Sequence, residues 1–322
     1  MIKTYLFTPT ETKENVPLDN WQSLVEDNSL LWVDVRSFTK EELDQLANQF
    51  GLHSITVGSI LDQYRRPHLY EFKDHFYINM TLLKKGNHNS RGINPSELHL
   101  IAGNKFIITI TREDKCEAVN AALTEYRDSP SQCERGSIYA VYLLAEDLVE
   151  TYFPIVEKLD DEADKLENEM LDKADQSLVK KLFNIKRQVF ELRRLLGPQR
   201  DIFNELNRRD FPFMQGESTV YFQDVYNRMV RVFDMLDTIR EILSGNLDIY
   251  LSTVSNRLNE VMKVLTVFAT ILMMLSFITG FYGMNFTHLP WLRAPHAFRN
   301  MIVLMTLVTM SLLWWFRRKG WL

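Results

Sequence analysis

The chain has 322 residues, of which 25% are charged, and a net charge of −5; it is long enough for one large or two modest domains. All of its acidic residues lie before position 261, whereas residues 261–322 are apolar with a basic end. This asymmetry argues against a uniformly water-soluble protein and is typical of a soluble body joined to a membrane-spanning region. The two cysteines, Cys116 and Cys133, lack metal-ligand spacing, and we expect free thiols in a reducing compartment.

Residues 1 to about 112 have the pattern of a mixed α/β domain. Five runs rich in β-branched and aromatic residues predict strands: 2–7, 30–35, 75–83, 97–103 and 105–111. The segment TKEELDQLANQFG predicts a helix with Thr39 as its N-cap and Gly51 after its last turn. No signal-peptide apolar run begins the sequence, so we expect no secretory cleavage and a cytoplasmic body. Neither a glycine-rich phosphate loop nor a nucleophile elbow is found, which makes an enzyme the least expected class.

From about Ser137 the pattern becomes helical, with a dense run of carboxylates between residues 157 and 175. A solvated helix face is the default interpretation of this run, and a role in screening or concentrating cations stays open. A second helix is predicted from Leu178 to Leu196, ended by Gly197 and Pro198.

A third helix is predicted to begin near Thr219. Apolar residues recur in it at heptad spacing, which favours helix packing: Val225, Met229, Val232, Leu236, Ile239 and Leu243. No proline occurs between Thr219 and Met284, so one helix of about 100 Å is expected at 1.5 Å per residue. Its end, Val264 to Met284, is uncharged, and so is Asn300 to Phe316. Both runs are near the ~20 residues that cross a bilayer, and they predict two spans.

The orientation follows from the basic C-terminus. Arg317, Arg318 and Lys319 follow the second span and favour the cytoplasmic side, which also places the N-terminal body there. The loop between the spans carries Arg293 and Arg299 and weakens this charge bias. The large body and the missing signal peptide still favour two cytoplasmic termini.

One face of the first span carries small, polar and methionine side chains, which step alternately by three and four residues: Asn259, Met262, Thr266, Ala269, Met273, Ser276, Gly280 and Gly283. A helix-packing seam explains the small residues, because Ser276 and Gly280 form a small-xxx-small pair. A lumen lined by one helix from each subunit of a ring explains the polar residues as well. The spacing alone leaves both interpretations open.

The stretch LDIYLSTVSNRLNEVMKVLTVFATILMMLSFITGFYGMNF, followed by a short loop, a second span and RRKGWL, resembles the CorA family of magnesium transporters. The motif that carries the resemblance is Tyr282 followed by Gly283, Met284 and Asn285 at the end of the first span, with NEVMKVLT before it. The resemblance is densest over residues 217–286 and extends over most of the chain.

The resemblance implies an α+β fold: an N-terminal cytoplasmic α/β domain, a long helical stalk and two C-terminal transmembrane helices, assembled as a funnel-shaped homopentamer. The corresponding division is an α/β domain at 1–135, an acidic helical hairpin at 136–216, a pore-lining helix at 217–284, an extracytoplasmic loop at 285–299, and the second span with the basic C-terminus at 300–322.

It also implies roles for individual residues. The outer selectivity ring is formed by Gly283, Met284 and Asn285. The pore and its inner gate are lined by Asn259, Met262, Leu265, Thr266, Ala269, Met273, Ser276 and Gly280. Regulatory metal binding involves Asp224 and Asp248, and Arg317, Arg318 and Lys319 form a basic collar. Neutral oxygen donors suit Mg²⁺, which keeps its water shell and crosses a pore only if its sites are weak.

Two departures from the family pattern stand out. The loop FTHLPWLRAPHAF contains no carboxylate where the family usually has acidic residues. Its histidines, His288 and His296, are either solvated or ligands for a softer metal such as Zn²⁺. In the family, intracellular Mg²⁺ is bridged between subunits by a carboxylate on the long helix, which Asp224 matches, and by one from the α/β domain, and it holds the channel closed. The second carboxylate is expected near KKGNHNS, residues 84–90, which contains no acid. We therefore expect Asp224→Ala to change inhibition by Mg²⁺ only modestly.

The expected function is gradient-driven transport of Mg²⁺, with Co²⁺ or Ni²⁺ as further ions, gated by intracellular divalent cation. Mg²⁺ is expected as cargo and as regulator, and no organic cofactor or nucleic acid is expected. The expected partners are four further copies of the chain and the lipids of the plasma membrane, which is the inner membrane in bacteria. The alternatives are a zinc transporter of the same superfamily, coupled or not to protons, and a non-conducting membrane-anchored sensor or scaffold.

Overall fold

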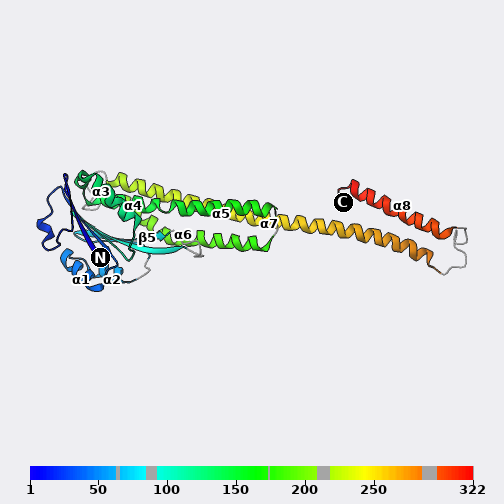
Figure 1. The fold of residues 1–322 in the computed structure, drawn as a ribbon, viewed down its shortest axis with the longest axis horizontal. Helices are drawn as coiled ribbons and strands as arrows, with labels where there is room; N and C mark the ends of the chain where they lie inside the picture. Colours follow the sequence, from blue (N-terminus) through cyan, green and yellow to red (C-terminus); the bar gives the residue numbers. More distant parts are fainter. Residues whose placement is uncertain (63–65, 85–92, 173–174, 209–217, 285–295, 322) are drawn as a thin grey trace. The chain divides into compact units, whose positions relative to one another are not determined.

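The computed structural model describes residues 1–62, 66–84, 93–172, 175–208, 218–284 and 296–321. Two compact units are distinguished by their internal contacts. The first contains Met1–Glu167 and Val179–Ser244, and the second contains Asn168–Leu178 and Gly245–Leu322. The elements of both are drawn in Figure 1.

The first unit is built on a mixed sheet in the order β2-β1-β3-β7-β6-β5-β4. Its strands are β1 (Ile2–Phe7), β2 (Thr12–Glu14), β3 (Leu30–Arg36), β4 (His68–Glu71), β5 (His75–Lys84), β6 (Asn94–Gly103) and β7 (Phe106–Thr111). The central strands β3 and β7 pair in parallel, with Leu31 opposite Phe106, and the other neighbours are antiparallel. The five predicted strands are confirmed, and the short strands β2 and β4 were not predicted.

Helices cover both faces of this sheet (Figure 1). On one face lie α1 (Lys40–Phe50) and α2 (Ser54–Leu61), whose Leu43, Leu46 and Ile60 join the core cluster with Val33 and Ile108 of the sheet. The helix α1 begins as predicted: Thr39 and Glu42 form a capping box, and Gly51 ends the helix at a φ of 63°. On the other face lie α3 (Glu117–Asp128) and α4 (Gly136–Glu150). Two short 3₁₀ turns, η1 (Trp21–Ser23) and η2 (Pro130–Arg135), complete the connections.

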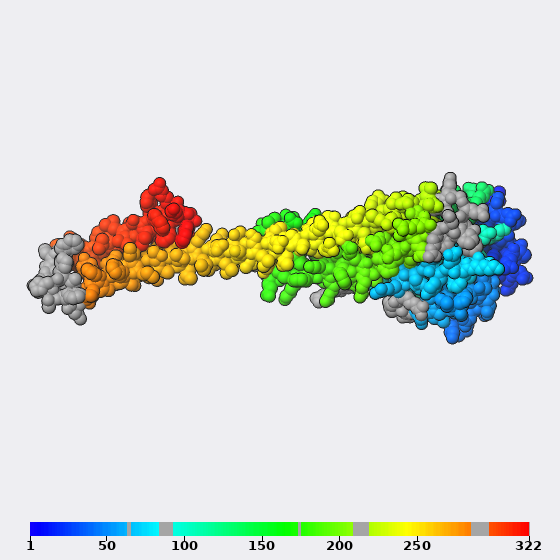
Figure 2. Space-filling view, turned by 180° about the vertical axis from the view of Figure 1, so that it is seen from behind, coloured from blue at the N-terminus to red at the C-terminus, as the bar shows by residue number. Residues whose placement is uncertain are grey.

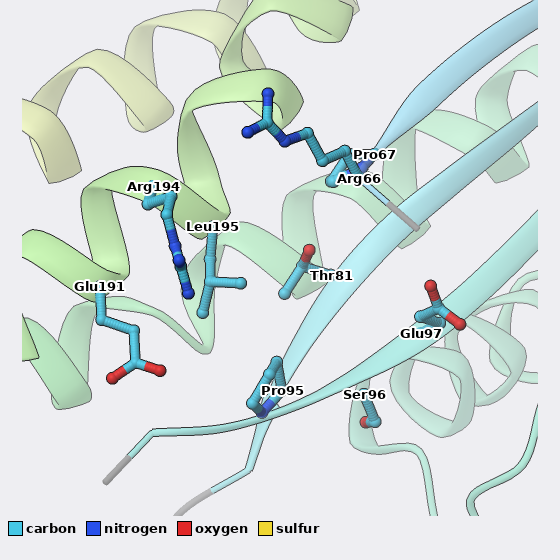
Figure 3. A pocket seen from close by; sticks show the side chains of 9 residues that line it. All are labelled: Arg66, Pro67, Thr81, Pro95, Ser96, Glu97, Glu191, Arg194 and Leu195. Atoms are coloured by element: carbon cyan, nitrogen blue, oxygen red, sulfur yellow. The ribbon is translucent and has the colours of Figure 1, made fainter. Parts of the chain in front are cut away.

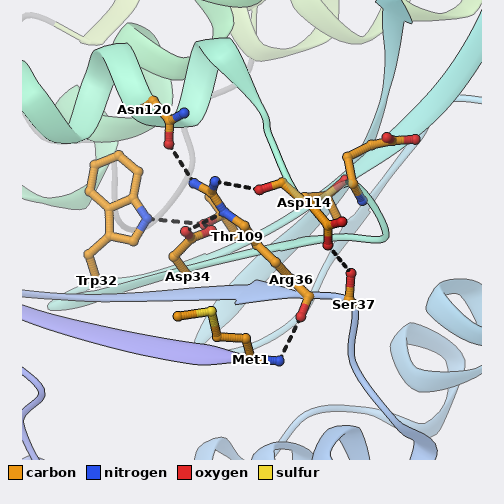
Figure 4. Close-up of polar contacts among 10 residues, drawn as sticks. Met1, Trp32, Asp34, Arg36, Ser37, Thr109, Asp114 and Asn120 are labelled. Atoms are coloured by element: carbon orange, nitrogen blue, oxygen red, sulfur yellow. Dashed lines mark hydrogen bonds and ion pairs between the residues drawn. The ribbon is translucent and has the colours of Figure 1, made fainter.

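A partly buried polar network links α3 to the sheet (Figure 4). The side chain of Asp34 is 1% exposed, and its Oδ1 and Oδ2 accept hydrogen bonds from Thr109 Oγ1 at 3.1 Å and from Arg36 Nε at 2.8 Å. Arg36 in turn donates from Nη2 to Asn120 Oδ1 on α3 at 2.7 Å. Burial raises the pKa of Asp34 although Arg36 and Thr109 act in the opposite direction.

Three long helices follow: α5 (Phe153–Asp172), α6 (Gln176–Arg208) and α7 (Ser218–Tyr282). The heptad face of α7 is the packing face in the first unit, and all six of its side chains are at most 1% exposed: Val225, Met229, Val232, Leu236, Ile239 and Leu243. Buried residues of α5 and α6, including Val156 and Leu192, have the same role. The heptad prediction is therefore confirmed as a packing face.

The predicted end of the second helix was wrong. The helix α6 does not stop at Gly197 but continues to Arg208 with Pro198 inside it. A proline in a helix costs about 3 kcal/mol, yet the side chains that follow it, Ile202, Phe203 and Leu206, are at most 4% exposed. Burial of this apolar face outweighs the local cost of the proline, and that gain depends on partners distant in sequence.

In the second unit the end of α7 is accompanied by α8 (Ala297–Arg318). Both helices contain stretches that are long and apolar enough to cross a membrane. The structure ends α7 at Tyr282 and begins α8 three residues before the predicted Asn300. The two helices run side by side in Figures 1 and 2.

Candidate ion pathway and regulatory carboxylates

The small and polar stripe of α7 lies on an exposed helix face. Its eight members, from Asn259 to Gly283, are all exposed in the single chain, and the side chain of Met273 is 72% exposed. The covered face is the opposite one: Val267 is 3% exposed, and Ile271, Leu275 and Ile278 are half-buried. At about 100° per residue, these covered positions lie roughly half a turn away from the stripe. The face of α7 on the side of α8 is thus not the stripe. The stripe remains exposed in the single chain.

Threonine hydroxyl groups on this part of α7 donate hydrogen bonds to backbone carbonyls one turn earlier in the helix. Thr266 Oγ1 donates to the carbonyl of Met262 at 2.7 Å, and Thr279 Oγ1 donates to that of Leu275 at 3.0 Å. The bond leaves the oxygen of each hydroxyl as an acceptor. Acceptor oxygens at an exposed face suit the water shell of a cation.

The candidate selectivity residues begin where α7 ends. The N–H of Gly283 donates to the carbonyl of Thr279 at 2.9 Å and closes the last turn. A side chain at position 283 would meet that carbonyl oxygen at 3.1 Å, so glycine avoids a close contact there. Met284 is exposed, whereas Asn285 and the loop to Pro295 lie outside the described residues. The ring of Gly283, Met284 and Asn285 remains a prediction.

The candidate gate residues Asn259, Met262 and Leu265 lie within two turns of α7. The side chains of Met262 and Leu265 are 62% and 65% exposed. Large apolar side chains with this exposure need lipid or further protein to cover them. Their role as a constriction between copies of the chain also remains a prediction, as does that of the other stripe members.

The basic collar is formed by the end of α8. Arg317 and Arg318 end the helix, and the N–H of Lys319 donates to the carbonyls of Trp315 and Phe316 at 3.1 Å. All three cations are exposed, and the guanidinium of Arg318 lies 5.5 Å from the ring centre of Trp314. Cations at a helix C-terminus interact favourably with its dipole. Their place around a pore remains a prediction.

The two candidate regulatory carboxylates on α7 are far apart. Asp224 and Asp248 are 24 residues apart in sequence, which is about 36 Å along a helix, so one ion cannot bind both in the same chain. Asp248 is exposed in the second unit. Asp224 is half-buried in the first unit and accepts a hydrogen bond from Arg228 Nε at 2.8 Å.

Arg228 was not among the predicted site residues. Its Nη2 lies 2.7 Å from Glu146 Oε1, and its Nη1 lies 3.2 Å from Glu150 Oε2, both on α4. The spacing of Asp224 and Arg228, four residues on a helix, is the one sequence signal that indicates a pair. The carboxylates of α4 were not detectable in this way, because they are distant in the chain. Among the described residues, no group of three or more His, Cys, Asp or Glu side chains has a geometry that would hold a metal ion.

A cavity of about 320 Å³ lies in the first unit beside α6 (Figure 3). Arg194 and Glu191 project into it from α6, and Arg66 and Glu97 line it from the sheet side. Two cations and two carboxylates balance, so the lining favours neither anions nor cations. Residues 85–90, where the partner of Asp224 was expected, lie outside the described residues.

Comparison with known proteins agrees with this architecture. The sequence profile of the CorA-like Mg²⁺ transporter proteins matches residues 27–318. The chain is 32% identical over 294 residues to the cobalt/magnesium transport protein CorA of Thermotoga maritima, covering 90% of this chain and 83% of that protein. It is 26% identical over 241 residues to the zinc transport protein ZntB of Pectobacterium carotovorum, covering 73% and 71%. The complete structure of the CorA magnesium transporter from Methanocaldococcus jannaschii superposes with a TM-score of 0.78 at 26% identity, covering 99% of this chain and 98% of that one.

Proposed function

The chain belongs to the family of CorA-like Mg²⁺ transporter proteins, and on that premise we propose that it conducts Mg²⁺ through a homopentameric pore lined by α7. Members of this family are divalent cation transporters and not enzymes. The observation that carries the proposal is the exposure of the whole stripe from Asn259 to Gly283 on the face of α7 opposite its covered side.

In this pore, the stripe of each copy faces a common lumen. Hydroxyl and amide oxygens then hydrogen-bond the water shell of the ion, and methionines form apolar constrictions. Weak oxygen sites are suitable because Mg²⁺ dehydrates reluctantly and has to leave each site again. The membrane potential drives the ion, since two charges gain about 4.6 kcal/mol per 100 mV, at roughly 2.3 kcal/mol per charge. Co²⁺ and Ni²⁺ are further ions of the same charge.

The same arrangement supports a proposed location. The two candidate spans in α7 and α8 cross the plasma membrane, which is the inner membrane in bacteria, and both termini are cytoplasmic. Gly283, Met284 and Asn285 then lie at the extracytoplasmic mouth, and Arg317, Arg318 and Lys319 lie at the cytoplasmic surface.

A second candidate ion is Zn²⁺, with or without proton coupling. It is favoured by the likeness to the zinc transport protein ZntB and by the absence of carboxylates from FTHLPWLRAPHAF, in which two histidines occur. Imidazole nitrogen suits Zn²⁺ better than it suits Mg²⁺.

The experiment is ion flux into liposomes that contain the purified protein, read with a Mg²⁺ dye or a Zn²⁺ dye. The variant is Asn285→Ala, and the matched control is Asn300→Ala, an exposed asparagine on α8. The proposal expects Mg²⁺ flux that is lost in Asn285→Ala and kept in Asn300→Ala. Zn²⁺ flux that follows a pH gradient would support the second candidate instead. If intact pentamers pass neither ion, the chain is a sensor or scaffold and the proposal fails.

A further inference from the structure

Arg228 of α7 is surrounded by three carboxylates, and each of its three guanidinium nitrogens faces a different one. Nε lies 2.8 Å from Asp224 Oδ2, Nη2 lies 2.7 Å from Glu146 Oε1, and Nη1 lies 3.2 Å from Glu150 Oε2. Charge-assisted hydrogen bonds from a planar guanidinium are among the stronger polar contacts in proteins. Each of the three nitrogens thus has its own acidic partner among the described residues.

The cluster joins two helices of the first unit. Glu146 and Glu150 are one turn apart on α4, and Asp224 and Arg228 are one turn apart on α7. One turn before the charges, the rings of Tyr142 and Tyr221 stack with their centres 4.9 Å apart. The aromatic contact holds the helices close at this level, so the guanidinium connects two surfaces that already face each other.

The charges of this cluster do not balance. Three carboxylates surround one cation. The side chains of Arg228 and Glu146 are 26% and 24% exposed, whereas those of Asp224 and Glu150 are 45% and 63% exposed. Nearby, the pKa of Asp147 is raised to about 6. Burial is the largest cause, and the charges of Glu146, Glu125 and Glu150 add to it. The hydrogen bond that Arg228 donates to Asp224 is the largest cause that raises the pKa of Arg228. The site therefore has an excess of negative charge, and its three carboxylates are arranged around one guanidinium rather than in a geometry that would itself hold a metal ion.

We propose that Arg228 is the resident cation of this carboxylate site: its guanidinium ties α4 to α7 and withdraws Asp224 from divalent cations. The consequence for gating rests on the proposed function: cytoplasmic Mg²⁺ does not close this channel through Asp224. A positively charged side chain replaces an exchangeable ion, so the contact between the helices persists at any Mg²⁺ concentration. Such a contact breaks only with movement of α4 relative to α7.

The test is binding of Mn²⁺, an oxygen-seeking divalent probe, to the full-length protein in detergent, counted by electron paramagnetic resonance. Arg228→Gln removes the cation and leaves the three carboxylates without their partner, so that their side chains can turn toward a divalent ion. The matched control is Arg231→Gln, an exposed arginine on the same helix whose guanidinium lies 6.0 Å from the ring centre of Phe153. We expect Arg228→Gln to bind one more Mn²⁺ per chain than the wild type and Arg231→Gln, and the gain to vanish in Arg228→Gln/Asp224→Asn.

Two results would overturn the proposal: a Mn²⁺ count in Arg228→Gln no higher than in the wild type, or a lower count in Asp224→Asn than in the wild type. The second comparison keeps Arg228 in place, so it decides the matter even if Arg228→Gln does not fold. Binding is counted without any transport. A chain that passes no ion would therefore refute the proposed function. It would not affect this proposal, which is judged only by the number of Mn²⁺ ions bound per chain.

Discussion

The side-chain oxygen of Gln199 accepts a hydrogen bond of 2.8 Å from the backbone N–H of Thr81 on β5, although Gln199 directly follows the helix-interior Pro198. Gln199 is fully buried, and its Nε2 also donates to the hydroxyl of Tyr152 at 2.8 Å. The residue after the proline thus anchors α6 to the sheet.

Replacing this anchor is expected to destabilise the first unit. Gln199→Leu leaves the buried N–H of Thr81 without its acceptor, which costs about 1–3 kcal/mol in the free energy of unfolding. Thermal unfolding followed by circular dichroism measures the loss. Gln223→Leu, at an exposed position on α7, serves as the control. Equal melting temperatures for the two variants would show that the anchor is energetically unimportant.

Asp147 is expected to lower stability at neutral pH. Its pKa in the folded state is about 6, above the ordinary 3.8, because burial and neighbouring carboxylates disfavour the charge. The folded state therefore binds more protons between these two values, and stability falls as the pH rises through 3.8 to 6. With allowance for partial exposure, Asp147→Asn is expected to gain about 1–2 kcal/mol at pH 7.

The gain from Asp147→Asn should shrink as the pH is lowered from 7 toward 4, because the wild-type carboxyl becomes neutral. Melting temperatures at several pH values measure it, with Asp128→Asn at an exposed position as the control. A variant that is less stable than the wild type at pH 7 would mean that the carboxylate has a stabilising partner.

Gly280→Leu is expected to reduce ion flux at least tenfold without unfolding the chain. A Cβ at position 280 meets no atom within 4 Å in the single chain, so any obstruction must come from outside it. In the proposed pore, five leucines would narrow the lumen at one level. Phe268→Leu, on a flanking exposed face, is the control, and flux is read in the same liposomes. Unchanged flux in Gly280→Leu would place the stripe against lipid.

Neutralising the basic collar is expected to increase flux several-fold at low ionic strength. Arg317→Gln/Arg318→Gln/Lys319→Gln removes three exposed cations that would repel divalent ions at the cytoplasmic mouth. The effect should fade in high salt, because the Debye length is about 10 Å at 0.1 M and 3 Å at 1 M. Arg317→Lys/Arg318→Lys keeps the charges as a control. A salt-independent change, or none, would remove the collar from the ion path.

Local patterns were sufficient for much of the architecture. The capping box at Thr39 and the heptad face of α7 are set by residues within a few positions of one another. The five strands with long β-branched runs were found for the same reason. The three-residue strand β2 and the four-residue strand β4 carry too little pattern, and they exist because β1 and β5 offer edges to pair with.

What the sequence could not supply were contacts between distant segments. Pro198 predicts a helix end, and only burial against other elements explains why α6 continues. Glu146 and Arg228 are 82 residues apart in sequence, so their pairing depends on how α4 meets α7. The stripe could be recognised from the spacing of its residues. The covered side of α7 could be identified only from the structure, in which α8 is present.

The continuity of α7 has a consequence for biosynthesis. The first unit is not complete until Ser244 has been made, and the uncharged run of the same helix begins soon afterwards, at Val264. Domains generally fold as they emerge from the ribosome, the N-terminal ones first. The first unit cannot finish folding before its last helix is made, and by then the ribosome is already synthesising the segment that enters the bilayer. Until α3 to α6 are ready to receive it, the heptad face of α7 stays open to water or lipid. Late folding of the body and early insertion of the span thus compete for one helix, and a mutation that slows the first would be seen as a defect in the second.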